Sequence, residues 1–226
     1  MSESTLNYLD SYCERAGSLM PLAEPVNFLT NAAFLIAAYF AYNIYKEKRI
    51  SFKFGWDYLA LIILLALIGI GSGVWHFVPD GTTLLFDVIP ILIFINLFFL
   101  SLLIRIFGMN WWQTLFLWLV FQGLGYVFEV NFDRDALGGT IMYIPTYLTL
   151  LFIAIALHIK ESKMKKYVIT AAVFWTFSLI LRTFDMQICS IFPIGTHFAW
   201  HLLNSIVLYQ LLKGLMLCQK PRYIRN

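Results

Sequence analysis

Charged residues are scarce in this sequence. Asp, Glu, Lys and Arg together make up 13% of its 226 residues, whereas hydrophobic residues make up 60%. A soluble domain of this size needs more charge to cover its surface, so the composition argues against a water-soluble globular protein. The mean hydropathy of +0.75 points the same way.

Long polar stretches are missing as well. Apolar runs of about 18 or more residues recur along the chain, and each is long enough to cross roughly 30 Å of hydrocarbon as a helix. We predict seven spans, at 26–45, 57–78, 84–104, 112–130, 140–159, 167–188 and 196–217. The short polar turns between them leave no room for a second soluble domain. The sequence therefore predicts one all-α membrane domain over 1–226, a seven-transmembrane-helix bundle in which 1–25 form an outer N-terminal segment.

Three further patterns are absent. Low-complexity tracts and internal repeats are not found, and the broken-helix repeats of many transporters are missing, which makes transport a weak hypothesis. The first 25 residues are mostly polar and acidic rather than basic and then apolar. We therefore expect no cleavable signal peptide.

Positive charge is depleted at one end of the predicted spans. Of the 16 Lys and Arg residues, 13 fall at the other end: Lys46, Lys48, Arg49, Lys53, Arg105, Lys160, Lys163, Lys165, Lys166, Lys213, Lys220, Arg222 and Arg225. The depleted end holds Glu3, Asp10, Glu14, Glu24, Asp80, Asp133 and Asp135, with Arg15 and Arg134 as its bases. The positive-inside rule then predicts an outward N-terminus and a cytoplasmic C-terminus. The bases are scattered over four short segments, so they do not indicate a nucleic-acid partner.

Cysteine is rare, with three residues in the chain. Cys13 and Cys189 both fall on the predicted outer side, where an oxidising compartment permits a disulfide. Cys218 lies at the inner end of the seventh span. The residues alone leave two readings open for Cys13 and Cys189, a disulfide bridge or two unpaired small core residues.

Ionisable residues inside the predicted spans are few, and such residues have a functional or pairing role by default. They are His76, Asp87, Arg182, Asp185, His197 and His201, with Glu129 and Asp57 near span ends. With alternating helix directions, His76, Asp87, His197 and His201 come to one depth near the outer face. Arg182 and Asp185 stand three residues apart, which we interpret as a buried pair that holds helices in register.

The spacing of the last two histidines indicates a metal site. His197 and His201 stand four residues apart on one helix face, so both imidazoles can reach one ion at roughly 2.0–2.1 Å, with His76 as a third ligand. Two hydrogen-bonded histidines or a bis-histidine haem site are the alternatives. Haem is disfavoured because its axial ligands must approach from opposite faces. Three imidazoles with one open position are typical of a catalytic zinc.

Two oxygen-bearing residues are predicted to lie beside this metal. Asp87 follows His76 across a tight turn and is the expected acceptor next to a dipositive site. Ser72 is four residues before His76 and shares its helix face. A packing role is the rival interpretation for Ser72, because Gly69 and Gly73 around it form a GxxxG pattern.

The order Ser72-x-x-x-His76, Asp87, His197-x-x-x-His201 resembles the CREST superfamily of seven-helix membrane hydrolases. This superfamily groups alkaline ceramidases with the progestin and adipoQ receptors and with lipid-remodelling proteins. The stretches YCER (12–15) and AEPVN (23–27), together with the outward N-terminus, are similar to the alkaline ceramidase family specifically. The resemblance extends over essentially the entire chain.

This resemblance implies a zinc-dependent amidase that hydrolyses ceramide-like N-acyl sphingoid lipids to a fatty acid and a sphingoid base. His76, His197 and His201 correspond to the zinc ligands. We expect Asp87 to act as the general base toward a water at the zinc, and Ser72 to donate to the developing oxyanion. The implied partner is a membrane lipid substrate, and no obligatory protein partner is inferred.

The resemblance also implies a disulfide between Cys13 and Cys189 and a possible calcium site at Glu14, Glu24 and Asp10. Two positions depart from the expected calcium ligands, because Ser11 stands where an aspartate is expected and Ala16 replaces an asparagine.

Two other functions remain open at this stage. One is a related lipid hydrolase that acts on an ester or remodels phospholipids. The other is a receptor-like protein whose zinc only joins helices. An integral, multi-pass location is predicted, with the site near the periplasmic or luminal face of a bacterial inner membrane or an endoplasmic-reticulum-type membrane.

Overall fold

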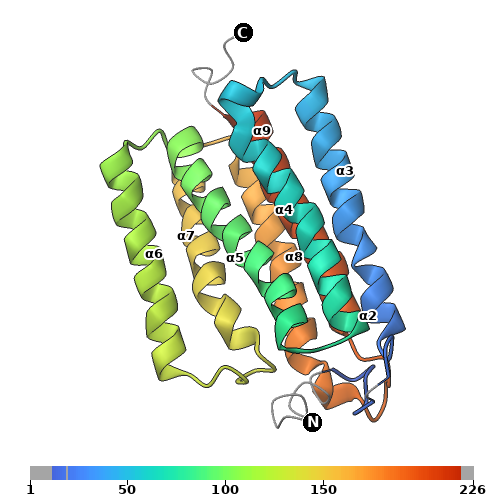
Figure 1. Ribbon diagram of the computed structural model, residues 1–226. Coiled ribbons are helices and arrows are strands. Elements are labelled where there is room, and N and C mark those ends of the chain that lie inside the picture. Colours follow the sequence, from blue (N-terminus) through green and yellow to red (C-terminus); the bar gives the residue numbers. More distant parts are fainter. Residues whose placement is uncertain (1–11, 19, 220–226) are drawn as a thin grey trace.

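The computed structural model describes residues 12–18 and 20–219, and within them it is a bundle of helices without strands (Figure 1). The α-helices are α2 (Pro25–Thr30), α3 (Ala32–Glu47), α4 (Phe52–Phe77), α5 (Gly81–Leu102), α6 (Trp111–Asn131), α7 (Ile144–Ile159), α8 (Lys165–Phe184) and α9 (His197–Cys218). Three short segments complete the structure: a π-helical turn η1 (Leu103–Phe107) and the 3-10 helices η2 (Thr140–Tyr143) and η3 (Met186–Ile188).

Seven of the helical stretches are long and apolar enough to cross a membrane, which confirms the predicted fold class. They run over Pro25–Glu47, Phe52–Phe77, Gly81–Phe107, Trp111–Asn131, Thr140–Ile159, Lys165–Phe184 and His197–Cys218. The described chain begins and ends at opposite ends of the bundle (Figure 1). Which end faces the cytoplasm stays a prediction from charge.

Two helix ends differ by several residues from the predicted spans. α4 begins at Phe52 rather than near 57, because Lys53 can extend its amine away from the apolar segment. Asp57 therefore lies inside α4, just past a kink at Gly55. α8 ends at Phe184 rather than near 188, and the chain then turns through η3 toward the start of α9.

The turn from α4 to α5 is set by local hydrogen bonds. Asp80 is the N-cap of α5, and its carboxylate accepts from the backbone N–H groups of Thr82 and Thr83. The Thr83 hydroxyl is in turn close to the Asp80 backbone N–H at 2.9 Å. This capping box fixes the start of α5 next to the end of α4, where His76 lies.

The helices contribute unequally to the core. In the most apolar 18-residue stretch of α4, 56% of the residues are buried, compared with 11% in that of α6. α6 lies at one side of the bundle beside α7 (Figure 1). α4 packs against α3 and α5, and α9 packs against α8 and α3. The two helices that carry the histidines are thus central, and α6 is peripheral.

Large apolar side chains cover the outside of the bundle. Trp112, Phe116, Phe152 and Ile155 are each more than half exposed. An exposed apolar surface of this extent is unfavourable in water but natural against lipid tails. With the seven apolar spans, this surface identifies a multi-pass membrane protein.

Two buried charges have partners that the sequence did not indicate. Arg105 lies in η1 at the end of the third helical stretch and pairs with Asp57, its Nη2 2.6 Å from Oδ1. The interpretation of Arg182 and Asp185 as a buried pair is wrong, because they form no ion pair in the part of the chain that the structure describes. The Asp185 carboxylate instead accepts backbone N–H groups, and the Arg182 guanidinium lies over the rings of Tyr143 and Trp200.

Candidate metal centre and lipid cavity

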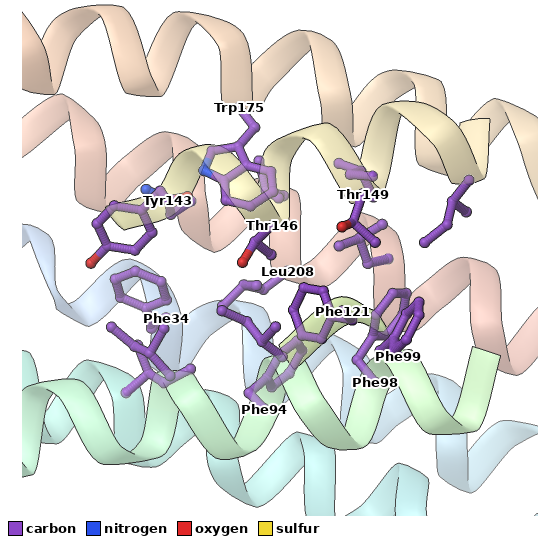
Figure 2. Close-up of a pocket in the computed structure, with 18 of the residues that line it drawn as sticks. Phe34, Phe94, Phe98, Phe99, Phe121, Tyr143, Thr146, Thr149, Trp175 and Leu208 are labelled. Atoms are coloured by element: carbon purple, nitrogen blue, oxygen red, sulfur yellow. The ribbon is translucent and has the colours of Figure 1, made fainter. Parts of the chain in front are cut away.

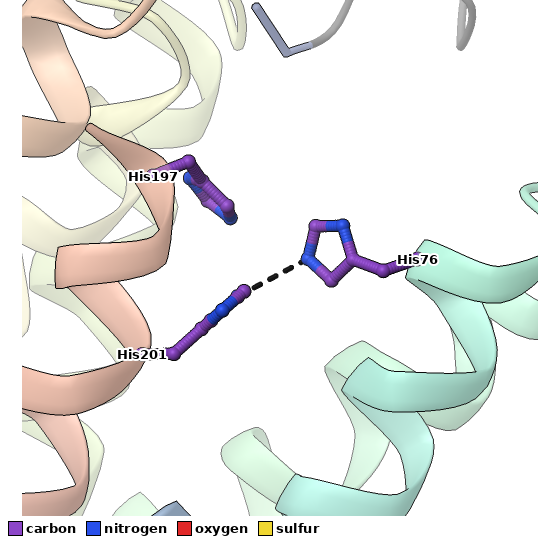
Figure 3. Close-up of side chains that lie close together, drawn as sticks. All are labelled: His76, His197 and His201. Atoms are coloured by element: carbon purple, nitrogen blue, oxygen red, sulfur yellow. Dashed lines mark hydrogen bonds between the residues drawn. The ribbon is translucent and has the colours of Figure 1, made fainter. Parts of the chain in front are cut away.

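The three predicted histidines converge at one end of the bundle. His76 comes from the last turn of α4, and His197 and His201 come from the first two turns of α9 (Figure 3). One nitrogen from each lies within 4.8 Å of the other two, and the rings are 1–2% exposed. The His76 Nε2 atom is 3.1 Å from the His201 Nε2 atom.

The outward nitrogens of two of these rings have defined partners. The His76 Nδ1 atom is 2.5 Å from Glu24 Oε2, and a carboxylate only accepts, so Nδ1 carries the proton. The His201 Nδ1 atom is 3.0 Å from the Thr30 hydroxyl. That hydroxyl is also 2.8 Å from the backbone carbonyl of Val26, so it can either donate to Val26 and accept from His201 Nδ1 or donate to His201 Nδ1.

The Nε2 atoms of His76 and His201 lie 3.1 Å apart. His76 Nε2 is an acceptor, because Nδ1 of this ring carries the proton, so the two rings either share one hydrogen bond or bind one cation between them. Two nitrogens bound to one tetrahedral zinc are roughly 3.3–3.4 Å apart, so the spacing suits a metal. Metal-binding histidines also usually donate their second nitrogen to a carboxylate or another oxygen, and Glu24 and Thr30 offer such oxygens to His76 and His201. The donor set fits a divalent metal such as zinc.

The loop before α9 holds His197 in place. The Asp185 carboxylate accepts the backbone N–H of His197 at 2.8 Å, that of Thr196 at 2.6 Å and that of Cys13 at 3.1 Å. Cys13 is also joined to Cys189 by the predicted disulfide. Gly195, at φ +66°, passes so close to Cys13 and Asp185 that an added Cβ would clash with both. The N-terminal segment is therefore fixed onto the loop that starts the histidine helix.

Ser72 and Asp87 are brought together by a close approach of α4 and α5. Gly71 packs against the backbone carbonyl of Phe86, and a Cβ at this position would collide with it. This contact brings Ser72 close to the Asp87 carboxylate, which also lies near His76. Gly69 instead packs against the backbone of Asn31, where an added Cβ would lie 2.9 Å from the Asn31 carbonyl oxygen. Gly69 thus allows close packing of α4 on Asn31, and Gly71 allows the close approach of α4 and α5 at the site.

Tyr12 covers the histidines from the N-terminal side. Its ring centroid is 4.1 Å from that of His197 and 5.0 Å from that of His76. Its hydroxyl accepts from Trp75 Nε1 at 3.4 Å and is hydrogen-bonded to Arg182. Burial raises the pKa of Tyr12 to about 12, so the phenol stays protonated at neutral pH.

The acidic residues considered for calcium have other partners. Both oxygens of Glu14 accept backbone N–H groups at the start of α2, from Val26 at 2.7 Å and from Asn27 at 2.8 Å. Glu24 is bonded to His76, to Asn27 and to Arg15. Burial alone would raise the pKa of Glu24, but these hydrogen bonds outweigh it and lower the pKa. Asp10, like Ser11, lies outside the described residues.

An apolar cavity lies within the bundle and extends from Phe34 to Phe99 and Phe121 (Figure 2). Its volume is about 810 Å³, including the open space at its entrance. Phe34 and Trp200 line the end near His201, with Phe34 6.5 Å from that ring between centroids. Phe99 and Phe121 line the far end, and Asn204 is among the few polar residues of the wall. The cavity has the lining of a site for a hydrocarbon chain.

Sequence reasoning missed the residues that surround the histidines. Glu24 was considered for calcium rather than as the partner of His76, and neither Thr30 nor Tyr12 was considered. A signal was present, because Asn27, Thr30 and Asn31 are polar residues in an apolar span. Their spacing of three and four residues puts them on one helix face, which is typical of a buried polar contact.

Comparison with known proteins bears on what this site does. Residues 3–223 match the model of one protein family, described as Ceramidase, while a comparison with curated proteins found no match. The matched region includes all the histidines, Ser72, Asp87 and the disulfide. It covers nearly the whole chain, and a family named for cleaving the amide bond of ceramide accords with a polar site beside a lipid-sized cavity. The chain therefore belongs to the ceramidase family of lipid amide hydrolases.

Proposed function

We propose that this protein is an intramembrane, zinc-dependent amidase. It hydrolyses ceramide-like N-acyl sphingoid lipids to a fatty acid and a sphingoid base. The observation that carries the proposal is the convergence of three buried imidazoles, with one nitrogen of each within 4.8 Å of the other two. Three such nitrogens are the usual protein ligands of a catalytic zinc.

His76, His197 and His201 would hold the metal. His197 supports this assignment independently, because its Nδ1 atom is buried and has no hydrogen-bond partner among the described residues. Zinc is favoured because three imidazoles with an open position are its usual catalytic ligand set. Zinc bound there would supply a Lewis acid and lower the pKa of water at the site.

Asp87 is the proposed general base. It lies on the side of the site that faces His76, and a carboxylate there can take a proton from water as the oxygen attacks the amide carbon. When the C–N bond breaks, Asp87 returns this proton to the nitrogen, which leaves as the amine of the sphingoid base. The water oxygen stays on the fatty acid. The balance is one water consumed for each amide cleaved.

Ser72 is assigned to positioning Asp87. The sequence predicts that its hydroxyl donates to the developing oxyanion, and its proximity to the Asp87 carboxylate supports this further role. A serine that donates there keeps one carboxylate oxygen occupied and leaves the other free for the water. Gly71 makes this contact possible by letting α4 approach α5 closely.

The apolar cavity is the proposed site of one hydrocarbon chain of the substrate. It ends next to His201, so an acyl chain that fills it brings its amide to the metal centre. The aromatic wall around Phe94, Phe98 and Trp175 excludes water from the chain. The charge distribution of the sequence favours a position of this end of the bundle near the periplasmic or luminal face.

Purified full-length protein in detergent tests the proposal. Zinc content and fatty-acid release are measured on a panel of ceramides, with ester and phospholipid substrates alongside. We expect one zinc per chain and release from ceramides, and His201→Ala should lose both. His158→Ala is the matched control, because this histidine ends α7 outside the cluster.

Four results would contradict the proposal. Wild-type protein without zinc, or His201→Ala with full amidase activity, would remove the metal from the mechanism. Release from esters or phospholipids alone would indicate a lipid hydrolase of a different specificity. Zinc without any turnover would indicate a structural metal in a receptor-like protein.

A further inference from the structure

Arg15 is a buried arginine in the segment before the first span. Its side chain is 0% exposed, and it lies between the N-terminal segment and the end of α4. A buried guanidinium is costly unless all its donors are paired. The partners of Arg15 therefore show which groups stabilise a positive charge at this position of the fold.

All the partners of Arg15 are oxygen atoms. Its Nε donates to Glu24 Oε1, and its Nη1 donates to the carbonyl of Ser18 at 3.0 Å and reaches that of Met20 at 3.5 Å. Its Nη2 donates to the carbonyl of His76 at 3.1 Å. One carboxylate and several backbone carbonyls around a positive charge form the kind of oxygen shell that a calcium ion takes in proteins.

The carboxylates near Arg15 are already used. Both oxygens of Glu14 accept backbone N–H groups, and both oxygens of Glu24 are bonded to Arg15, Asn27 or His76. Calcium needs six to eight oxygen ligands, typically several from carboxylates. Ala16, at φ +48°, offers no side-chain oxygen where the family pattern has asparagine. A dication next to the Arg15 guanidinium would also be repelled by it. The described residues do not fit a calcium site.

We propose that Arg15 is a built-in cation that takes the place of calcium at this position and makes the fold of the N-terminal segment independent of that ion. The guanidinium neutralises Glu24 and gathers the carbonyls of Ser18, Met20 and His76. A covalently attached charge cannot be removed by a chelator. The protein therefore keeps this end of the bundle ordered at any calcium concentration.

Arg15 is in addition a positioning residue for the metal centre. It holds one oxygen of Glu24, whose other oxygen accepts the proton of His76 Nδ1 at 2.5 Å. It also binds the backbone carbonyl of His76 directly. These two links fix both the main chain and the ring orientation of His76. Contacts of this kind typically change metal affinity by about 10–100-fold.

Calcium binding to the wild-type protein is the first test. Calcium-depleted full-length protein, with its zinc content checked, is titrated with calcium up to about 1 mM, the range of weak protein sites. The bound calcium and the melting temperature are measured, with magnesium as the control ion. We expect no saturable calcium binding and no change in melting temperature. One calcium bound per chain, or a rise in melting temperature specific to calcium, would overturn the proposal.

Variants at Arg15 test the positioning role. We compare Arg15→Ala and Arg15→Lys with Arg134→Ala, a control whose arginine is 71% exposed on its side chain and paired with Glu129. Arg15→Ala should lower the melting temperature by roughly 10 °C, since it leaves a buried carboxylate unpaired. It should also release zinc to a chelator at least about 10-fold faster than wild type. The melting temperature and the zinc-release rate of Arg15→Lys should lie between those of wild type and Arg15→Ala, because lysine keeps the charge but lacks the planar guanidinium.

The outcomes separate this inference from the proposed function. Zinc release from Arg15→Lys at the wild-type rate would overturn the positioning role, even if Arg15→Ala yields no folded protein. The positioning role rests on the proposed function only through this zinc measurement. A protein that lacks zinc altogether would contradict the proposed function, while calcium binding and melting temperature would still decide whether Arg15 replaces the ion.

Discussion

Two buried polar clusters lie at opposite ends of this bundle. The histidine cluster (Ser72, His76, Asp87, His197 and His201) gathers at the end of α4 and the start of α9. The arginine cluster (Asp57, Tyr58, Ser101, Arg105 and Gln219) gathers at the opposite end of α4. Both place ionisable groups in an apolar fold, where such groups are costly.

The clusters differ in how their polar atoms are satisfied. In the arginine cluster, Asp57 Oδ2 binds Arg105 Nε at 2.7 Å and the Ser101 hydroxyl at 2.6 Å, and Asp57 Oδ1 binds Arg105 Nη2 at 2.6 Å. In the histidine cluster, one nitrogen of each imidazole lies within 4.8 Å of the other two, and His197 Nδ1 has no hydrogen-bond partner among the described residues. A closed network holds helices together, whereas convergent nitrogens without a full set of hydrogen bonds can bind a ligand.

The largest expected effect comes from Asp87 in the histidine cluster. Asp87→Asn keeps the size of the side chain but removes the base. We expect kcat to fall by about 10²–10⁴-fold. Zinc content should stay at the wild-type level, because the three imidazoles are unchanged. Fatty-acid release and metal analysis of one preparation check both points, and an Asp87→Asn variant with wild-type kcat would show that another group takes the proton.

In the arginine cluster, a substitution of Arg105 should lower the stability of the fold and leave the activity unchanged. Arg105→Met leaves Asp57 buried without its partner and should destabilise the fold by about 3–5 kcal/mol. Activity per folded, zinc-loaded molecule should not change, since this cluster lies at the far end of α4. Thermal unfolding and active-site-normalised turnover provide the two measurements. A loss of kcat at unchanged stability would mean that the two ends are coupled.

Gly71 connects packing to the chemistry of the site. Gly71→Ala puts a Cβ against the Phe86 carbonyl and should push α4 and α5 apart. A displacement near 1 Å at Asp87 would lower kcat by about 100-fold, with zinc retained. Gly123→Ala in α6 is the matched control, because nothing lies within 4 Å of its added Cβ. Equal kcat in the two variants would refute the role given to the α4–α5 contact.

The smallest effect is expected from Thr30, which contacts the histidine cluster at the outward Nδ1 atom of His201. Thr30→Val keeps the shape of the side chain and removes the hydrogen bond at 3.0 Å. Zinc affinity should fall by about 10-fold, and the loss of activity should be recovered by added zinc. Competition with a zinc-binding dye measures the affinity. An unchanged affinity would imply that His201 does not need this hydrogen bond.

The seven spans could be predicted because crossing hydrocarbon requires about 20 apolar residues, and the sequence meets this requirement seven times. The positions of the histidines could be predicted for a related reason. Ionisable residues are rare inside spans, so four of them at one depth stand out. The i, i+4 spacing of His197 and His201 then supplied the geometry.

Other parts of the site could not be predicted. Arg15 and Glu24 precede the first span, and no periodicity tells where a polar segment folds back. The partner of Arg105 could not be predicted, because a base after an apolar run looks the same whether water or a carboxylate surrounds it. The π-helical turn η1 extends the helical stretch to Phe107 and keeps Arg105 at the depth of Asp57. Partner choice in both cases depends on tertiary contacts.

X-ray absorption at the zinc edge of the purified protein tests the central claim most directly. The account predicts one zinc per chain with nitrogen and oxygen ligands at roughly 2.0–2.1 Å and the scattering pattern of about three imidazoles. The His76→Ala, His197→Ala and His201→Ala variants should each lose this signal. A protein without zinc, or zinc with sulfur ligands at about 2.3 Å, would contradict a metal centre built from these histidines.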